Sequence, residues 1–342
     1  RGFLSPTVSG ALASTGSGKT EIFEVIALQL VLDSYVGALN KKDRSIAGFT
    51  KAILVYPMKA FMIDHFRRFV KDIIYINSKF LNTNDAKQLG LQISIGILYG
   101  DTPDGLSSED KILDAVEYLL GSKKCPIDGS DLEVQTFNEY PYYSIRCKSG
   151  DRHLINIIIS KDKLFKHPPD ILLTSIDSLN YILLEPNRHI LLGKQQPLPP
   201  LLLAVDEPHV YTGVFGSNVS LVFRAFDYAT QKYMGAPGYK PLKIATSATM
   251  SNAEEFLAKL FVEDANNIKV IYPTYSVQIQ NDKKGFLAFL PDSSYYGFQN
   301  ATVEVIPLIA GLLPKELRKV LVFVDSIDFA ETLKRYMEDY IS

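Results

Sequence analysis

The octapeptide Ala13-Ser14-Thr15-Gly16-Ser17-Gly18-Lys19-Thr20 decides the fold of this chain. It follows an apolar run at residues 8–12 that predicts a strand, and it precedes an apolar run at residues 22–32 that predicts a helix. A glycine-rich turn between a strand and a helix is the context of a phosphate-binding loop. Such a loop surrounds an anion with backbone N–H groups, and the positive end of the new helix dipole points at the same anion.

The residues of this loop have separate predicted roles. Gly16 and Gly18 allow the backbone amides to turn inward, because no Cβ stands in the way. Lys19 would reach the β- and γ-phosphates of ATP, and the Thr20 hydroxyl would bind Mg²⁺. The alternative is a corner that needs small residues only for packing, but Lys-Thr after two correctly spaced glycines favours the nucleotide site. The predicted nucleotide-binding residues are Thr15, Gly16, Ser17, Gly18, Lys19, Thr20 and Glu21.

Length and composition narrow the class of protein. The chain has 342 residues, so we expect about two domains, and its net charge of −2 gives no global basic field. Any nucleic-acid contact must therefore come from a local groove. Two cysteines, no signal peptide and no apolar run approaching ~20 residues predict a cytoplasmic protein without a membrane span. Because the sequence begins with Arg1 rather than Met, we expect it to be a piece of a longer protein.

Strand-like and helix-like segments alternate along most of the chain. This alternation predicts an α/β fold, in which a parallel sheet is covered by helices on both faces. The polar clusters follow the strands, so they would converge at the carboxyl edge of that sheet. The expected strands are residues 8–12, 52–56, 91–99, 171–174, 201–205 and 243–246, and the expected helices begin near residues 22, 59, 109, 178, 217 and 253. The signature Ser251-Asn252-Ala253-Glu254 predicts a capping box before the last of these helices.

The same patterns predict the domain organisation. Residues 1–272 would form the first, ATP-binding domain. Its alternation of strands and helices is interrupted by a β-rich insertion at about residues 121–167. The apolar residues of 273–301 follow neither helical nor strand periodicity, which predicts a linker. Residues 302–342 would begin a second α/β domain, with a strand at 319–324 and a helix that follows it. One face of that helix would carry Phe329, Leu333, Tyr336 and Met337.

An acidic pair supplies the chemistry that a phosphate loop lacks. Asp206 and Glu207 follow the most strand-like run of the chain. Asp206 would hold Mg²⁺ through water, and Glu207 would orient and deprotonate the water that attacks the γ-phosphate. Two adjacent acids at a strand end are often only a solvated turn. The phosphate loop and His209, two positions further on, favour the catalytic interpretation.

The order of these motifs resembles that of superfamily 2 helicases, in which two RecA-like domains close on ATP. Residues 15–20 resemble motif I, Asp206-Glu207-Pro208-His209 resembles the DExH box, and Ser247-Ala248-Thr249 resembles motif III. Motifs Ia, Ib and IV have counterparts at residues 56–60, 174–179 and 322–324. The stretch 206–217, together with Tyr99-Gly100-Asp101-Thr102-Pro103, is similar to the MrfA-like group, which includes repair helicases and the large helicase subunits of phage-defence systems.

The resemblance implies an ATP-dependent DNA helicase or translocase that acts in phage defence or repair, with DNA and other defence subunits as partners. An RNA helicase and a non-unwinding, ATP-gated scaffold subunit are the alternatives. The resemblance to superfamily 2 helicases further implies that His209, Ser247 and Thr249 couple nucleotide state to the interdomain cleft. Lys59, Thr174 and Ser175 would contact nucleic-acid phosphates, although Lys59 is equally consistent with an ordinary solvated lysine. The arginine finger is expected beyond Ser342, so this piece alone should hydrolyse ATP weakly.

The two cysteines raise the question of a metal in the insertion. Cys125-Pro126-Ile127-Asp128-Gly129 and Cys147-Lys148-Ser149-Gly150 resemble a zinc ribbon in which each second cysteine has been lost. Two thiolates with Asp128 or Asp151 make a poor tetrahedral set, so the sequence favours no metal at this place.

Overall fold

The computed structural model describes residues 8–12, 19–79, 81–136, 143–149, 153–247, 250, 252–271 and 327–341. The chain divides into two compact units, residues 1–274 and 275–342. In the second unit the described residues form one helix, α10 (Ile327–Ile341), in which Phe329 and Leu333 are buried and Tyr336 is exposed. The predicted linker, the strand at 319–324 and most of the proposed second domain lie outside the described residues.

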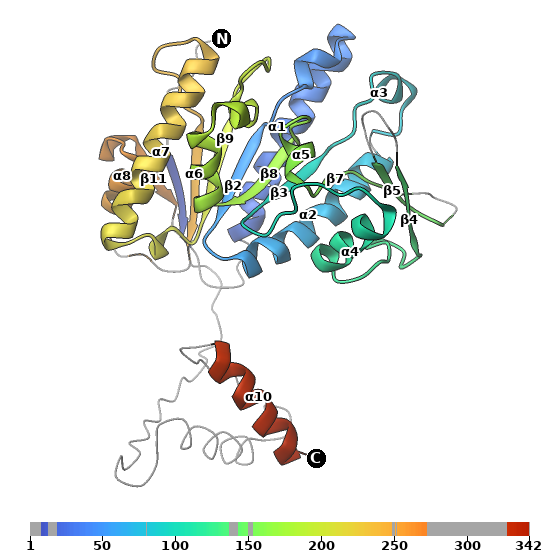
Figure 1. Ribbon diagram of the computed structural model, residues 1–342. Helices are drawn as coiled ribbons and strands as arrows, with labels where there is room; N and C mark the ends of the chain where they lie inside the picture. The colour runs from blue at the N-terminus through green and yellow to red at the C-terminus, as the bar shows by residue number, and fades with distance from the viewer. Residues whose placement is uncertain are drawn as a thin grey trace, which may run out of the picture. The chain divides into compact units, whose positions relative to one another are not determined.

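An eight-stranded sheet forms the centre of the first unit (Figure 1). Its strand order is β11-β1-β10-β9-β2-β8-β3-β7, and every neighbouring pair is parallel. The α/β fold with a parallel sheet is therefore confirmed. The strands of the sheet are β1 (Val8–Leu12), β2 (Ala52–Tyr56), β3 (Ile95–Leu98), β7 (Ile157–Ile158), β8 (Ile171–Ser175), β9 (Leu202–Asp206), β10 (Leu242–Ser247) and β11 (Ile268–Ile271).

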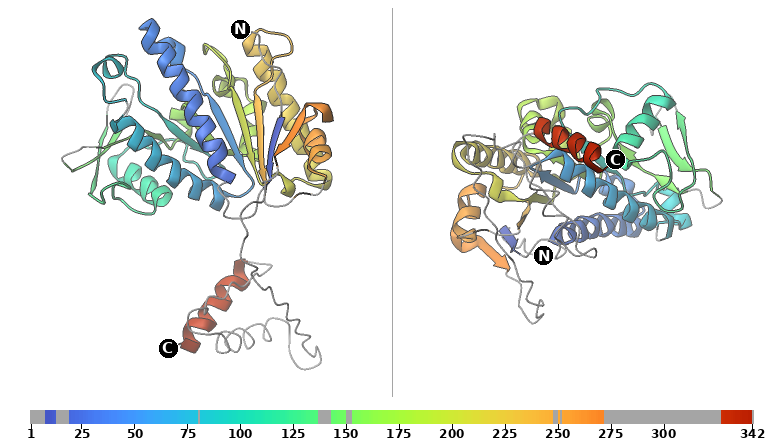
Figure 2. Two further views of the ribbon diagram at one scale, coloured as in Figure 1. Left: turned by 180° about the vertical axis from the view of Figure 1, so that it is seen from behind. Right: turned by 90° about the horizontal axis from the view of Figure 1, so that it is seen from below.

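Helices cover both faces of this sheet (Figures 1 and 2). Successive residues of a strand point to opposite faces, so Ala52 and Leu54 join one apolar core with α1 and α2, while Ile53 and Val55 join another with α6 and α7. The helices of the first unit are α1 (Lys19–Lys41), α2 (Lys59–Lys79), α3 (Asn84–Gln88), α4 (Glu109–Leu120), α5 (Lys161–Leu164), α6 (Ile176–Leu184), α7 (Gly213–Met234) and α8 (Ala253–Phe261), with 3₁₀ turns η1 (Arg44–Ala47), η2 (Pro186–Leu192), η3 (Pro208–Val210) and η4 (Ala265–Asn267).

Helix α1 includes a segment, Glu21–Lys41, that is long and apolar enough to cross a membrane, which differs from the expectation that no such run exists. Length and composition of this kind are also found in helices that line a protein core. In α1 the side chains of Phe23, Ala27 and Val31 are buried against the sheet. That packing accounts for the buried part of α1, while Ile22, Val25 and Val36 of the same helix are exposed.

Two local predictions differ from the structure. The third strand is confined to Ile95–Leu98, because the preceding Ile93 makes its backbone hydrogen bonds with the Asn77 side chain instead of a neighbouring strand. At α8, Ser251 of the expected capping box lies outside the described residues. The N-cap is Asn252, which has a positive φ of 50° and makes no side-chain capping bond.

A buried ion pair joins the amino ends of neighbouring strands. The Lys51 ammonium, which is 0% exposed, lies 2.6 Å from Oδ1 of Asp170. The other carboxylate oxygen accepts hydrogen bonds from the hydroxyl of Tyr35 and from the amide and hydroxyl of Ser94. A buried charge with all its partners present fixes the register of β2 against β8 at the edge opposite the carboxyl ends.

The insertion contains a second, smaller sheet, as its alternating runs predict. Strands β4 (Leu132–Thr136), β5 (Tyr143–Cys147) and β6 (Leu154–Ile155) pair antiparallel. The inward side chains, Val134 and Ile145 among them, belong to the same core as α1 and α2. The insertion is therefore packed onto the first unit by a continuous apolar interior.

Candidate functional site

The predicted acidic pair lies at the carboxyl edge of the main sheet. Strand β9 ends at Asp206, and the neighbouring β10 pairs Thr246 with Asp206. The next strand, β1, pairs its last residue, Leu12, with Ser247. Three adjacent strands thus end side by side, and this edge is where open α/β sheets bind ligands.

Both ends of the phosphate loop reach this edge. Strand β1 ends at Leu12, and helix α1 begins at Lys19. The predicted residues Thr15, Gly16, Ser17 and Gly18 lie outside the described residues, and of Lys19 and Thr20 the structure describes the backbone. The described residues on either side of the loop are the end of β1, which pairs with Ser247 of β10, and the start of α1. Glu21, also predicted to bind nucleotide, has an exposed carboxylate 3.6 Å from a guanidinium nitrogen of Arg68.

Asp206 is held in a fixed orientation at this edge. Its residue is 7% exposed, and its Oδ1 accepts a 2.8 Å hydrogen bond from the Thr246 hydroxyl. Thr246 is fully buried, so the donor itself has little freedom to move. A buried carboxylate oriented by a neighbouring strand has the chemistry of a Mg²⁺ ligand.

Glu207 has an uncommon backbone conformation. Its φ of 45° and ψ of 52° place it in the left-handed region, which costs a non-glycine residue about 1–3 kcal/mol. The Glu207 amide donates to the Thr246 carbonyl at 2.8 Å, which helps hold this conformation. The turn directs the carboxylate back over β10, where Oε2 accepts a 3.2 Å hydrogen bond from the Ser247 hydroxyl.

His209 completes a cluster with Glu207 and Ser247. Its Nδ1 lies 2.8 Å from Oγ of Ser247 and 3.1 Å from Oε2 of Glu207. The structure therefore brings together two of the three predicted coupling residues and links them to the predicted base. The third, Thr249, lies outside the described residues. These contacts join the polar ends of two adjacent strands, β9 and β10.

A cluster of buried polar side chains, Glu24, Tyr56 and His65, was not predicted from the sequence. Among the described residues, no partner is found for Oε1 of Glu24, the Tyr56 hydroxyl or Nδ1 of His65. Burial raises the pKa of Glu24 to about 7, with Arg68 opposing the shift and nearby carboxylates, including Asp206, adding to it. Burial lowers the pKa of His65 to about 4. An acidic residue, Glu24, among the apolar residues of a predicted helix could have indicated this buried polar cluster from the sequence.

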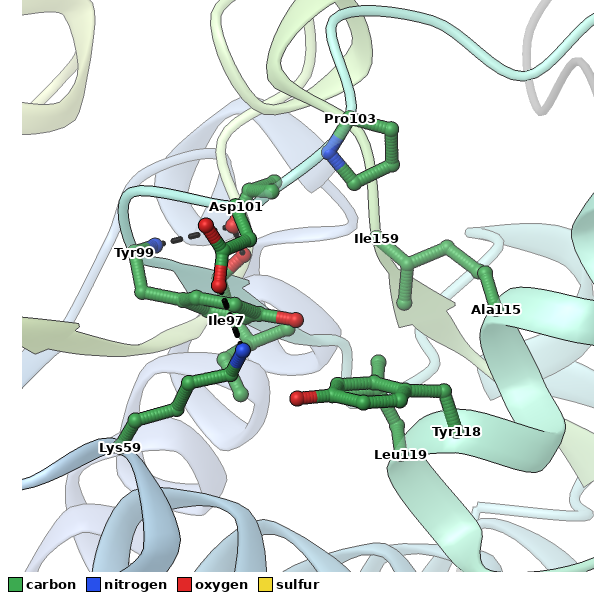
Figure 3. Close-up of a pocket in the computed structure, with 10 residues that line it drawn as sticks. Lys59, Ile97, Tyr99, Asp101, Pro103, Ala115, Tyr118, Leu119 and Ile159 are labelled. Atoms are coloured by element: carbon green, nitrogen blue, oxygen red, sulfur yellow. Dashed lines mark hydrogen bonds and ion pairs between the residues drawn. The ribbon is translucent and has the colours of Figure 1, made fainter. Parts of the chain in front are cut away.

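A second group of predicted residues follows strands β2, β8 and β3, beside β9. Lys59 begins α2, and its ammonium lies 2.5 Å from Oδ2 of Asp101 (Figure 3). The same ammonium lies 4.9 Å from the ring centre of Tyr99 and 5.0 Å from that of Tyr118. The hydrogen bond that the Lys59 ammonium donates to the Asp101 carboxylate raises the pKa of Lys59. These side chains line a cavity of about 320 Å³ between the turn after β3 and helix α4.

The structure places the two hydroxyls predicted to contact phosphate in different environments. Thr174 is 0% exposed, and its hydroxyl donates to the Leu98 carbonyl at 3.0 Å, so it joins β8 to β3. Ser175 is partly exposed at the N-cap of α6, where its hydroxyl accepts from the Ser178 amide. In this conformation Ser175 and Lys59 reach the surface of this edge, and Thr174 does not.

The sequence of this chain is similar to those of known helicases. Residues 7–120 match the family model described as DEAD/DEAH box helicase. A curated relative, the Uncharacterized ATP-dependent helicase MJ1574 of Methanocaldococcus jannaschii, is 31% identical over 224 residues, which is 64% of this chain and 30% of that protein.

Solved structures show the same fold. The crystal structure of the DUF1998 helicase MrfA matches with a TM-score of 0.54 and 18% identity, covering 98% of this chain and 36% of that one. MrfA bound to DNA and AMPPNP matches with a TM-score of 0.51 and 17% identity, covering 97% and 34%. The chain thus spans about a third of the length of the proteins it matches. The match of residues 7–120 to the DEAD/DEAH box helicase model and the similarity to MJ1574 bear out the resemblance that the sequence motifs indicated, and the solved structures show the same fold.

Proposed function

We propose that this chain is the ATP-binding part of a superfamily 2 motor that uses ATP hydrolysis to move along or unwind DNA. The observation that carries the proposal is the cluster of Glu207, Ser247 and His209, placed beside Asp206 at the edge that receives both ends of the phosphate loop. A plain solvated turn would not need three polar side chains joined across two strands.

The loop residues and the acidic pair would have separate roles in ATP hydrolysis. Lys19 and the loop amides would hold the phosphates, and Thr20 and Asp206 would bind the Mg²⁺ that neutralises the developing charge. Glu207 would accept the proton of the attacking water. The residues that the structure describes fit this role, because Asp206 and Glu207 emerge from one strand end with their carboxylates separately oriented by Thr246 and Ser247.

The coupling step would pass through the same cluster. Glu207 would face the nucleotide, and His209, further along the turn, contacts both Glu207 and Ser247. A change in the charge near Glu207 on hydrolysis would alter its hydrogen bond with Ser247 and hence the position of His209. In a closed motor His209 and Thr249 would transmit that change to the second domain.

The nucleic-acid side would lie over the ends of β2, β8 and β3. Lys59 and Ser175 supply a cation and a hydroxyl at the surface there, and such contacts to phosphate carry no sequence information. The helicase MrfA has been crystallised with DNA, which favours DNA over RNA as the track. A role in phage defence or repair, alongside other subunits in a reducing cytoplasm, is consistent with the two free cysteines.

The test is the ATPase activity of a protein that contains this chain, measured with no nucleic acid, with single-stranded DNA and with RNA. The informative variant is Glu207→Gln, and Glu133→Gln, an exposed acid on β4, is the matched control. We expect DNA to stimulate wild type and control alike. Glu207→Gln should retain ATP binding and lose turnover by about 10²-fold or more.

Each other outcome points to a specific alternative. Stimulation by RNA alone would identify an RNA helicase. Nucleotide binding without turnover under all conditions would identify an ATP-gated scaffold. Normal turnover in Glu207→Gln would remove this residue from the role of base and would contradict the proposal.

A further inference from the structure

Four side chains with metal-binding atoms converge in the insertion. They are Cys125, Asp128, Cys147 and His153, and their ligand atoms all lie within 4.8 Å of one another. His153 Nδ1 lies 3.5 Å from Cys125 Sγ and 3.5 Å from Asp128 Oδ2. Both cysteines and His153 are buried, with exposures of 3%, 0% and 8%.

The backbone brings these residues together through two turns. In the first, the Gly129 amide donates to the Cys125 carbonyl at 2.9 Å, and the positive φ of 72° at Gly129 closes the turn around Asp128. In the second, Cys147 ends β5 and His153 stands just before β6, and the Cys147 amide donates to the His153 carbonyl at 3.1 Å. The two turns face each other, so each supplies two ligands.

We propose that Cys125, Asp128, Cys147 and His153 bind one Zn²⁺ ion as a structural site. Two thiolates, an imidazole nitrogen and a carboxylate oxygen are all zinc ligands, and four protein ligands leave no open position for catalysis. Metal–ligand bonds of about 2.0–2.3 Å in a tetrahedron place the ligand atoms about 3.3–3.8 Å apart. The two 3.5 Å separations at His153 already lie in that range.

Neighbouring groups orient the ligands as a metal site requires. The Ser130 amide and hydroxyl both donate to Oδ1 of Asp128, and this leaves Oδ2 directed at His153. The Cys147 sulfur accepts a hydrogen bond from the His153 amide at 2.9 Å. In the part of the chain that the structure describes, no lysine or arginine pairs with Asp128, so its Oδ2 faces His153 without a competing side-chain cation.

A disulfide between the two cysteines explains the cluster less well. It would account for Cys125 and Cys147 but would give the buried imidazole and the oriented carboxylate no part. A bound ion gives all four groups a partner at once. It would also tie the loop around residues 125–129 to the β5–β6 hairpin, whose inner face packs into the main core.

The sequence alone favoured no metal here, because two thiolates with Asp128 or Asp151 make a poor tetrahedral set and nothing in the local pattern points to His153. Asp128 occupies the place of a second cysteine in the first turn, and His153 lies six residues after Cys147. Asp151, the other acid considered, lies outside the described residues. The fourth ligand is identified by the folding of the hairpin, which returns His153 to the sulfur of Cys147.

The test is to purify the full chain with a reductant and without chelator, and to count bound metal by plasma mass spectrometry. We expect about one zinc per chain. After the zinc is removed, addition of Co²⁺ should give the visible bands of tetrahedral cobalt and the near-ultraviolet band of cobalt–thiolate charge transfer. Chelation should lower the thermal midpoint by several degrees, because the ion binds only the folded chain.

Variants separate the ligands from their surroundings. Cys147→Ser should lose the metal, and Asp128→Asn, at a partly exposed position, should keep the thiolate band but bind Co²⁺ about 10-fold or more weakly. Asp131→Asn, an exposed acid three residues away, is the matched control and should behave as wild type. If Cys147→Ser fails to fold, Asp128→Asn against Asp131→Asn decides the question. Two titratable free thiols with no zinc and no cobalt spectrum, or a disulfide in their place, would overturn the proposal.

Discussion

Nδ1 of His209 lies 2.8 Å from Oγ of Ser247, although the two residues are 38 positions apart in the chain. The parallel pairing of β9 and β10 makes this contact possible, because it ends both strands at the same edge. Oε2 of Glu207 accepts a hydrogen bond from the same Ser247 hydroxyl and also lies 3.1 Å from Nδ1 of His209, so the three side chains contact one another. This short chain of polar contacts is the physical route by which nucleotide state would be sensed.

Removal of the Ser247 hydroxyl should weaken the coupling between DNA binding and ATP hydrolysis. In Ser247→Ala, Glu207 and His209 lose their common partner, and a hydrogen bond to a charged group is worth about 1.5–3 kcal/mol. We expect nucleotide affinity to change little and DNA-stimulated ATPase to fall about 10-fold or more, measured in the protein that contains this chain. Ser220→Ala, which removes only a bond within α7, is the control. Unchanged stimulation in Ser247→Ala would show that the bridge carries no coupling.

The buried Glu24 should make stability depend on pH. Its folded pKa is about 7, above the ordinary 4.5, so the folded chain holds the proton more tightly than the unfolded chain. Stability should therefore fall as pH rises from about 4.5 to about 7 and then level off. Glu24→Gln should remove this loss and be more stable than wild type by about 2 kcal/mol at pH 8, with little gain at pH 5.

The measurement is urea unfolding of the two proteins at both pH values. Asp33→Asn, an exposed acid on the same helix, is the control and should leave the pH dependence unchanged. A Glu24→Gln curve parallel to that of wild type across this range would show that Glu24 is charged in the folded chain.

The buried ion pair between Lys51 and Asp170 should be costly to break. Lys51→Met leaves the Asp170 carboxylate buried without its cation, and we expect a loss of about 3–5 kcal/mol in unfolding free energy. The double variant with Asp170→Asn should recover part of that loss, because no uncompensated charge remains. Glu255→Gln, which breaks an exposed i,i+4 pair with Lys259, should cost less than about 0.5 kcal/mol. Equal losses in the buried and exposed variants would contradict the assignment.

Lys59 should be restrained by Asp101 when no nucleic acid is bound. If Lys59 contacts phosphate, Lys59→Ala should weaken DNA binding and lower the salt dependence by about one counterion. Asp101→Asn should strengthen binding about 2- to 10-fold, because it frees the ammonium from a 2.5 Å ion pair. Lys87→Ala, on α3, is the control for loss of an exposed lysine. Binding measured by fluorescence anisotropy at several salt concentrations decides the matter, and weaker binding in Asp101→Asn would contradict this role.

The sequence by itself determined the fold class and the position of the acidic pair at a strand end, and it predicted the phosphate loop. These depend on local patterns: a buried parallel strand is a continuous apolar run, and the polar residues after it must lie at one edge of the sheet. The same reasoning placed Glu207, Ser247 and His209 close together, and the structure confirms that they meet.

Only the tertiary structure decided features that depend on residues far apart in the chain. It buried Thr174 against the Leu98 carbonyl, gave Glu207 its left-handed backbone, and placed His153 against Cys125 and Asp128. None of these features is indicated by a local sequence pattern, because each results from the packing of one element on another. A sequence pattern specifies which faces are apolar, whereas the partner of a polar side chain is fixed by the three-dimensional position of the residue that satisfies it.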